Sequence, residues 1–462
     1  MKPTYRNFLM AAAVTVALAM VTGSCSLWKK YETPTNVPLI DTYAQALNAP
    51  VDSTSLGNLG WREVFTDPTL QGYIERALAS NIDLQNAKID VDIAQARLQG
   101  AKLYYLPSVV FSPNGAGVKV GDSDMNWGWQ LPLTVSWQAD IFGQITNQKR
   151  AAESVVVQSE AYKQAVQSQI IAAVASTYYT LVSLHNQLDI YTQNSRLCEQ
   201  TSQLMRDMKE SARYTEVAVV QADANYYNVM AAIPDIKLGI TQANNTMSLL
   251  LNEQRADWPV NARSQLTLPV SIENGVPMSY LAARPDVRAA EQSFAQAYYA
   301  TNVARANFYP QLTLTGTGAY GTLLGSSVVD PAQWLVNLAG SLTAPLLQRG
   351  QVKATYEAAK LQQQKALNNF QYSILNAGTE VSNQLANIAA YRDKQQSVAQ
   401  QEANLEKAVE YNQDLMAYST TTYLEVITAQ QSLLISQISL ENVKLQNNLN
   451  IINLYQALGG GR

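Results

Sequence analysis

Two hydrophobic periods alternate along the chain, and they predict long helices joined by pairs of strands. Residues 144 to about 209 contain neither proline nor glycine. A helix over this whole stretch would be about 100 Å long at 1.5 Å per residue. Within it a strict 4,3,4,3 spacing, typical of a coiled-coil seam, links Ile170, Val174, Thr177, Leu181, Leu184, Leu188, Tyr191, Ser195 and Cys198. A helix of this length must pack along other long helices.

Stretches with a two-residue period precede each long helix. Leu131, Leu133 and Val135 alternate with polar residues, and Leu312 and Leu314 do the same. We therefore predict four strands, near 106–120, 125–142, 310–321 and 334–347. Four strands cannot close a barrel, which needs about eight, and an open sheet edge cannot face lipid. Closure requires several chains, and three copies would supply twelve strands.

The same order of elements occurs twice. Leu78, Asp83, Ala94, Ala101 and Pro107 recur 203 residues later as Leu281, Asp286, Ala297, Ala304 and Pro310. We therefore predict a first repeat over 61–252, with strands at about 106–142 and long helices at about 144–252. A linker over 253–280 is followed by a second repeat over 281–462, with strands at about 310–347 and long helices at about 350–457. The predicted fold is mainly α with a small β part, built from duplicated long-helix hairpins.

The N-terminus is typical of an export signal with a lipid attachment site. Lys2 and Arg6 precede an uncharged apolar run, and small residues lead up to Cys25. This resembles the signal of a bacterial lipoprotein, in which the cysteine becomes the acylated first residue of the mature chain. We predict a signal peptide over 1–24 and a lipid-anchored extension over 25–60. The alternative is ordinary cleavage nearby, with Cys25 an incidental thiol.

Composition argues against several classes of function. The 462 residues include only 15% charged residues, against about 25% in ordinary soluble domains, and the net charge of -4 comes with no cluster of Lys and Arg for nucleic acid. Two cysteines and the single His185 cannot form a disulfide scaffold or a zinc site. There is no phosphate loop or nucleophile motif. We expect no catalytic residue, no metal site and no cofactor except a covalent lipid on Cys25, and hence no enzyme.

Several motifs resemble those of TolC-like outer-membrane factors, in particular the lipoprotein branch that serves resistance-nodulation-division (RND) multidrug efflux pumps. The motifs are Trp61-Arg-Glu-Val-Phe65 followed by Asp67-Pro68, Arg284-Pro-Asp-Val287, and Phe308-Tyr-Pro310. The resemblance implies a homotrimer with an α-helical barrel in the periplasm and a twelve-stranded transmembrane β-barrel. It also implies an equatorial belt around the helices, in which the segment 253–280 would be an equatorial linker. It also implies a lipid-anchored protein in the outer membrane of a Gram-negative bacterium. The implied partners are a periplasmic adaptor (membrane fusion) protein, an inner-membrane RND transporter and outer-membrane lipid.

The resemblance also implies sites at the breaks between the long helices. A periplasmic gate would involve Leu424, Glu425 and Thr428, although Thr428 replaces a frequent Asp and Ser419 a usual Gly. Three copies of Glu425 in a narrow ring would repel one another and attract cations; the alternative is a solvated glutamate near a helix N-terminus. Adaptor contacts would involve Arg213, Tyr214, Thr215, Glu216, Ser419, Thr420, Thr421 and Thr422, which could equally be helix caps.

The function implied is a passive exit duct that conducts drugs or other small toxic compounds. An alternative is the same architecture serving type I protein secretion or metal export. From a different class, the chain could be a lipid-anchored periplasmic coiled-coil scaffold without a pore. The alternating strand pairs argue against a scaffold, which has no use for them.

Overall fold

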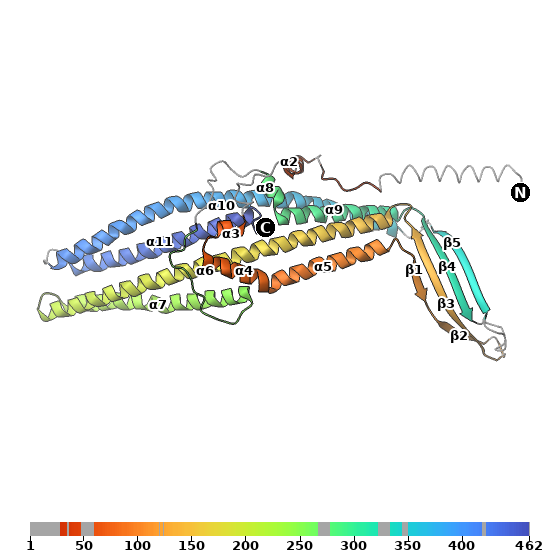
Figure 1. Cartoon of the computed structure of the whole chain (residues 1–462). Helices are drawn as coiled ribbons and strands as arrows, with labels where there is room; N and C mark the ends of the chain where they lie inside the picture. Colours follow the sequence, from red (N-terminus) through yellow and green to blue (C-terminus); the bar gives the residue numbers. More distant parts are fainter. Residues whose placement is uncertain are drawn as a thin grey trace. The chain divides into compact units, whose positions relative to one another are not determined.

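The computed structural model describes residues 28–34, 37–47, 60–119, 121–122, 124–266, 278–321, 333–343, 350–417 and 422–461. The predicted signal peptide, Cys25 and the tip residues Ser419, Thr420 and Thr421 lie outside these ranges. Figure 1 shows the described elements, whose bounds are α2 Pro38–Leu47, α3 Trp61–Val64, α4 Pro68–Ser80, α5 Ile82–Leu103, β1 Ser108–Phe111, β2 Asn114–Val118, β3 Asn126–Ala139, α6 Gln144–Glu210, α7 Glu216–Leu251, α8 Met278–Ala283, α9 Pro285–Ala306, β4 Gln311–Gly321, β5 Gln333–Thr343, α10 Gln351–Ala417 and α11 Tyr423–Ala457. The predicted class, mainly α with a small β part, is confirmed.

The chain forms two compact units. Unit 1 comprises the described residues within 1–36, 89–160 and 288–372, and unit 2 those within 37–88, 161–287 and 373–462. Each unit therefore takes segments from both predicted repeats. No helix in the described part of the chain is both long and apolar enough to cross a membrane.

Unit 1 contains an antiparallel sheet in the order β1-β3-β4-β5, with β2 also paired to β3. The register places Val109 opposite Val135 and Trp137 opposite Leu314. The prediction of one strand over 106–120 is wrong in detail, because β1 and β2 lie along the same edge of β3 with Pro113 between them. Proline has no N–H to donate to the ladder, so the strand is interrupted there.

One face of this sheet is apolar and exposed in the single chain. Leu133, Val135, Trp137, Leu314 and Leu338 are all exposed large hydrophobic residues. They alternate with polar or small neighbours, as the two-residue period predicted. A contiguous apolar surface of this kind marks an interaction site with protein or lipid.

Unit 2 contains most of the long-helix packing. α6 runs for 67 residues without a break, which confirms the predicted long helix, and α10 has the same length. In the part of α6 that belongs to unit 2, the seam residues Ile170, Val174 and Leu181 are buried. Leu184 and Leu188 are only half-buried, so the packing is looser at these two positions.

The segment after α7 is fixed to unit 2 by hydrogen bonds. Asp67 caps α4 by accepting from the backbone N–H of Thr69 at 2.9 Å, directly before Pro68 in the first turn. Its other oxygen accepts from the hydroxyl of Tyr178 at 2.9 Å, and that hydroxyl accepts from the backbone N–H of Asn261 at 3.0 Å. Asp67 therefore caps α4 and, through the Tyr178 hydroxyl, also holds the first part of the predicted equatorial linker.

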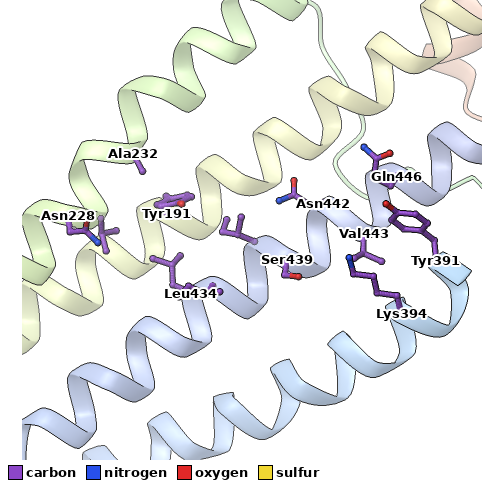
Figure 2. Close-up of a pocket in the computed structure, with 13 residues that line it drawn as sticks. Tyr191, Asn228, Ala232, Tyr391, Lys394, Leu434, Ser439, Asn442, Val443 and Gln446 are labelled. Atoms are coloured by element: carbon purple, nitrogen blue, oxygen red, sulfur yellow. The ribbon is translucent and has the colours of Figure 1, made fainter. Parts of the chain in front are cut away.

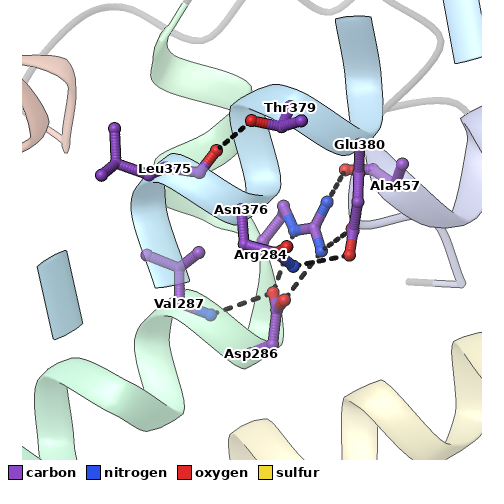
Figure 3. Close-up of polar contacts among 8 residues, drawn as sticks. All are labelled: Arg284, Asp286, Val287, Leu375, Asn376, Thr379, Glu380 and Ala457. Carbon is purple, nitrogen blue, oxygen red and sulfur yellow. Dashed lines mark hydrogen bonds and ion pairs between the residues drawn. The ribbon is translucent and has the colours of Figure 1, made fainter. Parts of the chain in front are cut away.

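A buried arginine joins α9, α10 and the end of α11 (Figure 3). The Arg284 guanidinium forms two bonds to Asp286, at 2.9 and 2.7 Å. It also donates to Glu380 on α10 at 2.7 Å and to the carbonyl oxygen of Ala457 at 2.8 Å. The Arg-Pro-Asp motif of the second repeat is thus an anchor between helices.

Candidate functional site

The predicted tip of the first hairpin lies where α6 turns into α7 in unit 2. α6 ends at Glu210 and α7 begins at Glu216, so the predicted adaptor-contact residues 213–216 lie at the break between two long helices. Ala212 has a φ of 54°, in the left-handed region, and its N–H donates to the carbonyl of Lys209 at 2.9 Å. The N–H of Arg213 donates to the carbonyl of Met208 at 2.9 Å. These two bonds satisfy carbonyls at the end of α6 and close the turn.

An apolar cluster holds this hairpin to the second one. We call it the tip cluster; its buried members are Met205, Ala218, Val219, Ala222, Met416, Val426 and Ile427. At its border the rings of Tyr214 and Tyr423 meet edge to face, with centroids 5.7 Å apart. The cluster takes residues from α6, α7, α10 and α11, so it sets the relative position of the two hairpin ends.

Polar bonds beside the tip cluster connect the same helices. Gln430 on α11 donates to the hydroxyl of Thr201 on α6 at 2.9 Å. Gln431 donates to the Asn225 side chain on α7 at 2.8 Å. Because the bond between Gln430 and Thr201 is buried, breaking it would leave unpaired polar groups, which is costly.

Asn225 also donates to the sulfur of Cys198 at 3.2 Å. Cys198, the last residue of the predicted seam, is 3% exposed. Burial raises the pKa of its thiol to about 11. The thiol is therefore neutral at physiological pH and is a poor nucleophile.

Two ion pairs lie at the outer surface of the first hairpin. Arg206 donates to both oxygens of Asp223, at 2.8 and 3.0 Å, and the Ser202 hydroxyl donates to the same carboxylate. The Ser202 bond and the Arg206 charge hold the pKa of Asp223 below its ordinary value. Lys209 pairs with Glu216 across the turn. These pairs are exposed, so each contributes little to stability.

The predicted gate residues lie together in the first two turns of α11. Leu424 is 56% exposed, and Glu425 and Thr428 are also exposed. Glu425 accepts from the backbone N–H of Thr422 at 3.3 Å, and the Thr422 hydroxyl accepts from the N–H of Glu425 at 3.4 Å. This reciprocal capping box fixes the start of α11. Glu425 and Thr422 therefore have a capping role, and a gate role for Leu424, Glu425 and Thr428 stays a prediction.

The predicted adaptor-contact residues differ in how exposed their side chains are. Arg213, Thr215 and Glu216 are exposed, and so is Thr422. Tyr214 is half-buried against the tip cluster, which reduces the surface that it could offer a partner.

Sequence reasoning missed the tip cluster and the pairing of Arg206 with Asp223. The two residues of that pair are 17 positions apart on opposite sides of a turn, so no helical spacing reveals them. Met205 and Met416 come from different hairpins, and nothing in the sequence connects them.

A second candidate site is a cavity of about 580 Å³ in unit 2. Figure 2 shows that Tyr191 on α6 and Asn228 on α7 lie on one side of it, and Tyr391 and Lys394 of α10 on another. Residues of α11, including Leu434, complete the lining. Lys394 is the one charged side chain among the residues that line this cavity. The lining therefore contains no pair of an acid and a base that could transfer protons in catalysis. The described residues contain no group of three or more His, Cys, Asp or Glu that could hold a metal ion.

The chain is similar to known proteins over most of its length. The family model described as outer membrane efflux protein matches residues 73–253 and 276–460. The cation efflux system protein CusC of Escherichia coli O6:H1 is 28% identical over 450 residues, which cover 96% of this chain and 97% of CusC. The toluene efflux pump outer membrane protein TtgC of Pseudomonas putida is 26% identical over 475 residues, with 98% and 95% covered.

A solved structure of CusC has the same fold. It superimposes with a TM-score of 0.83 at 24% identity, covering 94% of this chain and 99% of the CusC chain. Since the family model covers most of the sequence, this protein belongs to the outer membrane efflux protein family and is an outer-membrane exit duct of an efflux system.

Proposed function

We propose that three copies of this chain form the exit duct of a tripartite efflux pump. The observation that carries the proposal is the small open sheet, with an exposed apolar face, joined to a pair of 67-residue helices. β1, β2 and β5 are edge strands, and an edge in lipid leaves backbone groups without partners. Further copies would pair these edges and close a transmembrane β-barrel, while the long helices would form an α-helical barrel.

The proposed partners are a periplasmic adaptor protein and an inner-membrane RND transporter. The two helical hairpin ends, held together by the tip cluster, are the surfaces that we assign to these contacts. The exposed side chains of Arg213, Thr215 and Glu216 are suited to polar contacts with an adaptor. The duct itself would be passive, a channel rather than an enzyme.

The proposed cargo is small toxic compounds, including drugs. TtgC is named for toluene efflux and CusC for cation efflux, so similar ducts serve different cargo. Export of metal cations is the second candidate, and the similarity to CusC over nearly its whole length favours it. Protein secretion through a type I system has no comparable support.

We further propose that Cys25 carries a covalent lipid that anchors the mature chain. The pattern of residues up to Cys25 supports this assignment. A lipid anchor would hold the chain at the membrane before the sheet is closed by other copies.

Crosslinking in the native cell, followed by purification of this protein and mass spectrometry, tests the proposed pump. We expect an adaptor and a proton-driven RND transporter to be recovered with it. Recovery of an ATP-driven secretion transporter instead would contradict the proposal. Recovery of no inner-membrane partner would favour a scaffold. Growth of a deletion strain on dyes, solvents, copper and silver would then separate organic cargo from cations.

A further inference from the structure

The ends of the unit 1 helices meet in one layer beside the sheet. The hydroxyls of Tyr105, after α5, and Thr146, in the first turn of α6, share a hydrogen bond of 2.8 Å. The Gln144 side chain on α6 donates to Asn307, after α9, at 2.9 Å. We use the term helix–sheet junction for the last two turns of α5 and α9 and the first two turns of α6 and α10.

The start of α10 belongs to the same layer. The rings of Phe308, after α9, and Tyr356, on α10, meet edge to face with centroids 5.7 Å apart. Phe308 is exposed, as are Tyr104 and Leu106 after α5. Exposed aromatic and apolar side chains at the end of a sheet are typical of the headgroup level of a membrane.

The helix–sheet junction is rich in cations. Its charged residues are the acid Glu357 and the bases Arg97, Lys102, Lys149, Arg150, Arg305 and Lys353. Asp140, just before α6, accepts from the backbone N–H groups of Ile145 and Thr146, so its carboxylate serves as a helix cap. The acid closest in sequence on α6 is Glu153, which pairs with Lys149 at 3.4 Å.

The helix dipoles explain only some of these cations. Lys102 and Arg305 lie at helix C-termini, where the dipole favours a positive charge. Lys353, however, lies in the first turn of α10, where the dipole disfavours it, and neither α6 nor α10 has an acid in its first turn. Among the described residues, Lys102, Arg305 and Lys353 have no carboxylate within ion-pair distance. The surplus of positive charge is therefore open to an external anion.

The segment 28–34 brings two more lysines to the junction. Arg150 donates to the backbone carbonyls of Trp28 and Lys29, at 2.8 and 3.3 Å. The N–H of Tyr31 donates to the hydroxyl of Tyr299 on α9 at 3.0 Å, which holds the segment against unit 1. Lys29 and Lys30 are both exposed.

This placement connects the cations to the proposed lipid anchor. Cys25 precedes Trp28 by three residues, a distance of at most about 11 Å at 3.6 Å per extended residue. A lipid on Cys25 would therefore enter the membrane beside Lys29 and Lys30. Trp28 itself is 41% exposed and has the side chain that favours this interface.

We propose that the helix–sheet junction of unit 1 binds the headgroups of anionic phospholipids in the membrane leaflet next to the lipid anchor. The cations of this surface are Lys29, Lys30, Lys102, Lys149, Arg305 and Lys353. The proposal rests on the proposed function, which places the sheet in the outer membrane. Phosphate groups at the membrane surface would supply the anions that Lys102, Arg305 and Lys353 lack among the described residues, and exposed aromatic rings flank these cations.

The test compares two variants with the same change in charge. In the first, Lys102→Gln, Lys149→Gln and Lys353→Gln remove cations of the junction. In the control, Lys88→Gln, Lys237→Gln and Lys407→Gln remove exposed lysines of unit 2. The full-length protein is delipidated in detergent and titrated with phosphatidylglycerol or phosphatidylcholine, and bound lipid is counted by native mass spectrometry.

We expect the wild type and the control to prefer phosphatidylglycerol. One cation near an anionic surface changes affinity by roughly fivefold, so the junction variant should lose affinity for this lipid by on the order of 100-fold. Equal affinities of junction and control variants, or no preference for phosphatidylglycerol, would overturn the proposal. Displacement of the lipid by inorganic phosphate at equal concentration would also overturn it, because the site would then bind a free anion.

The same spectra report the oligomeric state. A wild-type protein that is not a trimer would contradict the proposed function. The difference in lipid binding between the two variants would still be measurable, so the two failures are distinguishable.

Discussion

Nη2 of Arg284 lies 2.7 Å from Oε2 of Glu380, although the two residues are 96 positions apart in the sequence. The guanidinium is 7% exposed, while the carboxylates of Glu380 and Asp286 are 44% and 47% exposed. Because the guanidinium is buried, only its hydrogen-bond partners compensate for the water that it has lost. The two carboxylates are partly exposed and can also be hydrated. Arg284 is therefore the member of this network whose removal costs most.

Arg284→Gln should destabilise unit 2 by about 2 kcal/mol, because it removes four hydrogen bonds and leaves the Ala457 carbonyl without its donor. The exposed partners keep the effect below that of a fully buried pair. Thermal unfolding of the purified protein measures it as a lower Tm. Glu75→Gln, which breaks an exposed ion pair with Arg62, is the control and should change stability by less than about 0.5 kcal/mol. Similar Tm values for both variants would contradict the anchor role.

The tip cluster should control local opening of the hairpin ends. Met205→Ala creates a cavity at a fully buried position and should cost about 2–5 kcal/mol. Hydrogen exchange of the amides in 201–225 should accelerate, while amides of unit 1 should not change. Leu249→Ala, at a position that is 80% exposed, provides the control. Unchanged exchange at the tip would show that the cluster does not hold the hairpins together.

Asp67 should make stability depend on pH on the acid side. Burial alone would raise the pKa of this carboxyl, but hydrogen bonds from Ser264, Tyr178 and the N–H groups of Thr69 and Leu70 outweigh burial and lower the pKa. A pKa that is lower in the folded than in the unfolded state gives stability that is present above about pH 4 and lost as the pH falls through the folded value.

Asp67→Asn tests this dependence. Because Asn can also cap a helix, the variant should lose only about 1 kcal/mol at pH 7. The stability difference between wild type and variant should shrink when urea unfolding is repeated toward pH 3. A difference that stays constant with pH would show that ionisation of Asp67 does not contribute.

Glu425 should affect ion selectivity if three copies line the duct. Glu425→Gln removes the charge but keeps a side chain that completes a capping box, so the start of α11 should remain intact. In planar bilayers the variant should show a weaker preference for cations than the wild type. Glu216→Gln, in the first turn of α7, serves as the control. Unchanged selectivity and conductance of the Glu425 variant would exclude it from the gate.

Cys25→Ser should abolish labelling of the protein with radioactive palmitate. The other cysteine, Cys198, is buried and has a raised pKa, so Cys198→Ser should leave labelling unchanged. Cells are labelled during growth, and the protein is isolated and counted. Labelling of the Cys25 variant would contradict lipid attachment at this position.

The sequence predicts the parts of this protein that depend on local periodicity. The absence of proline and glycine between 144 and 209 predicts α6 almost to its last residue. The alternation around Leu133 predicts β3. Each of these signals lies within one element.

The parts that depend on contacts between distant segments could not be predicted in the same way. Met205 and Met416 enter one cluster only because two hairpins lie side by side. Nothing in the spacing of Arg284 indicates Glu380 as its partner. The predicted gate depends on distant contacts as well. The capping box of Thr422 and Glu425 forms within one chain, whereas a ring of Glu425 carboxylates requires other copies of the chain.

The pairing of β3 with β4 joins the first repeat to the second, with Trp137 opposite Leu314 and Gln130 opposite Gly321. A chain with a single repeat would have to make this contact with another molecule, and the proposed ring of three chains would become a ring of six. Duplication within one gene frees the two sides of that contact to evolve separately. The two hairpin ends differ in sequence, with Arg213 and Tyr214 at one and a run of hydroxyl residues at the other. An adaptor of the proposed kind would therefore meet two chemically different surfaces on every copy of the protein.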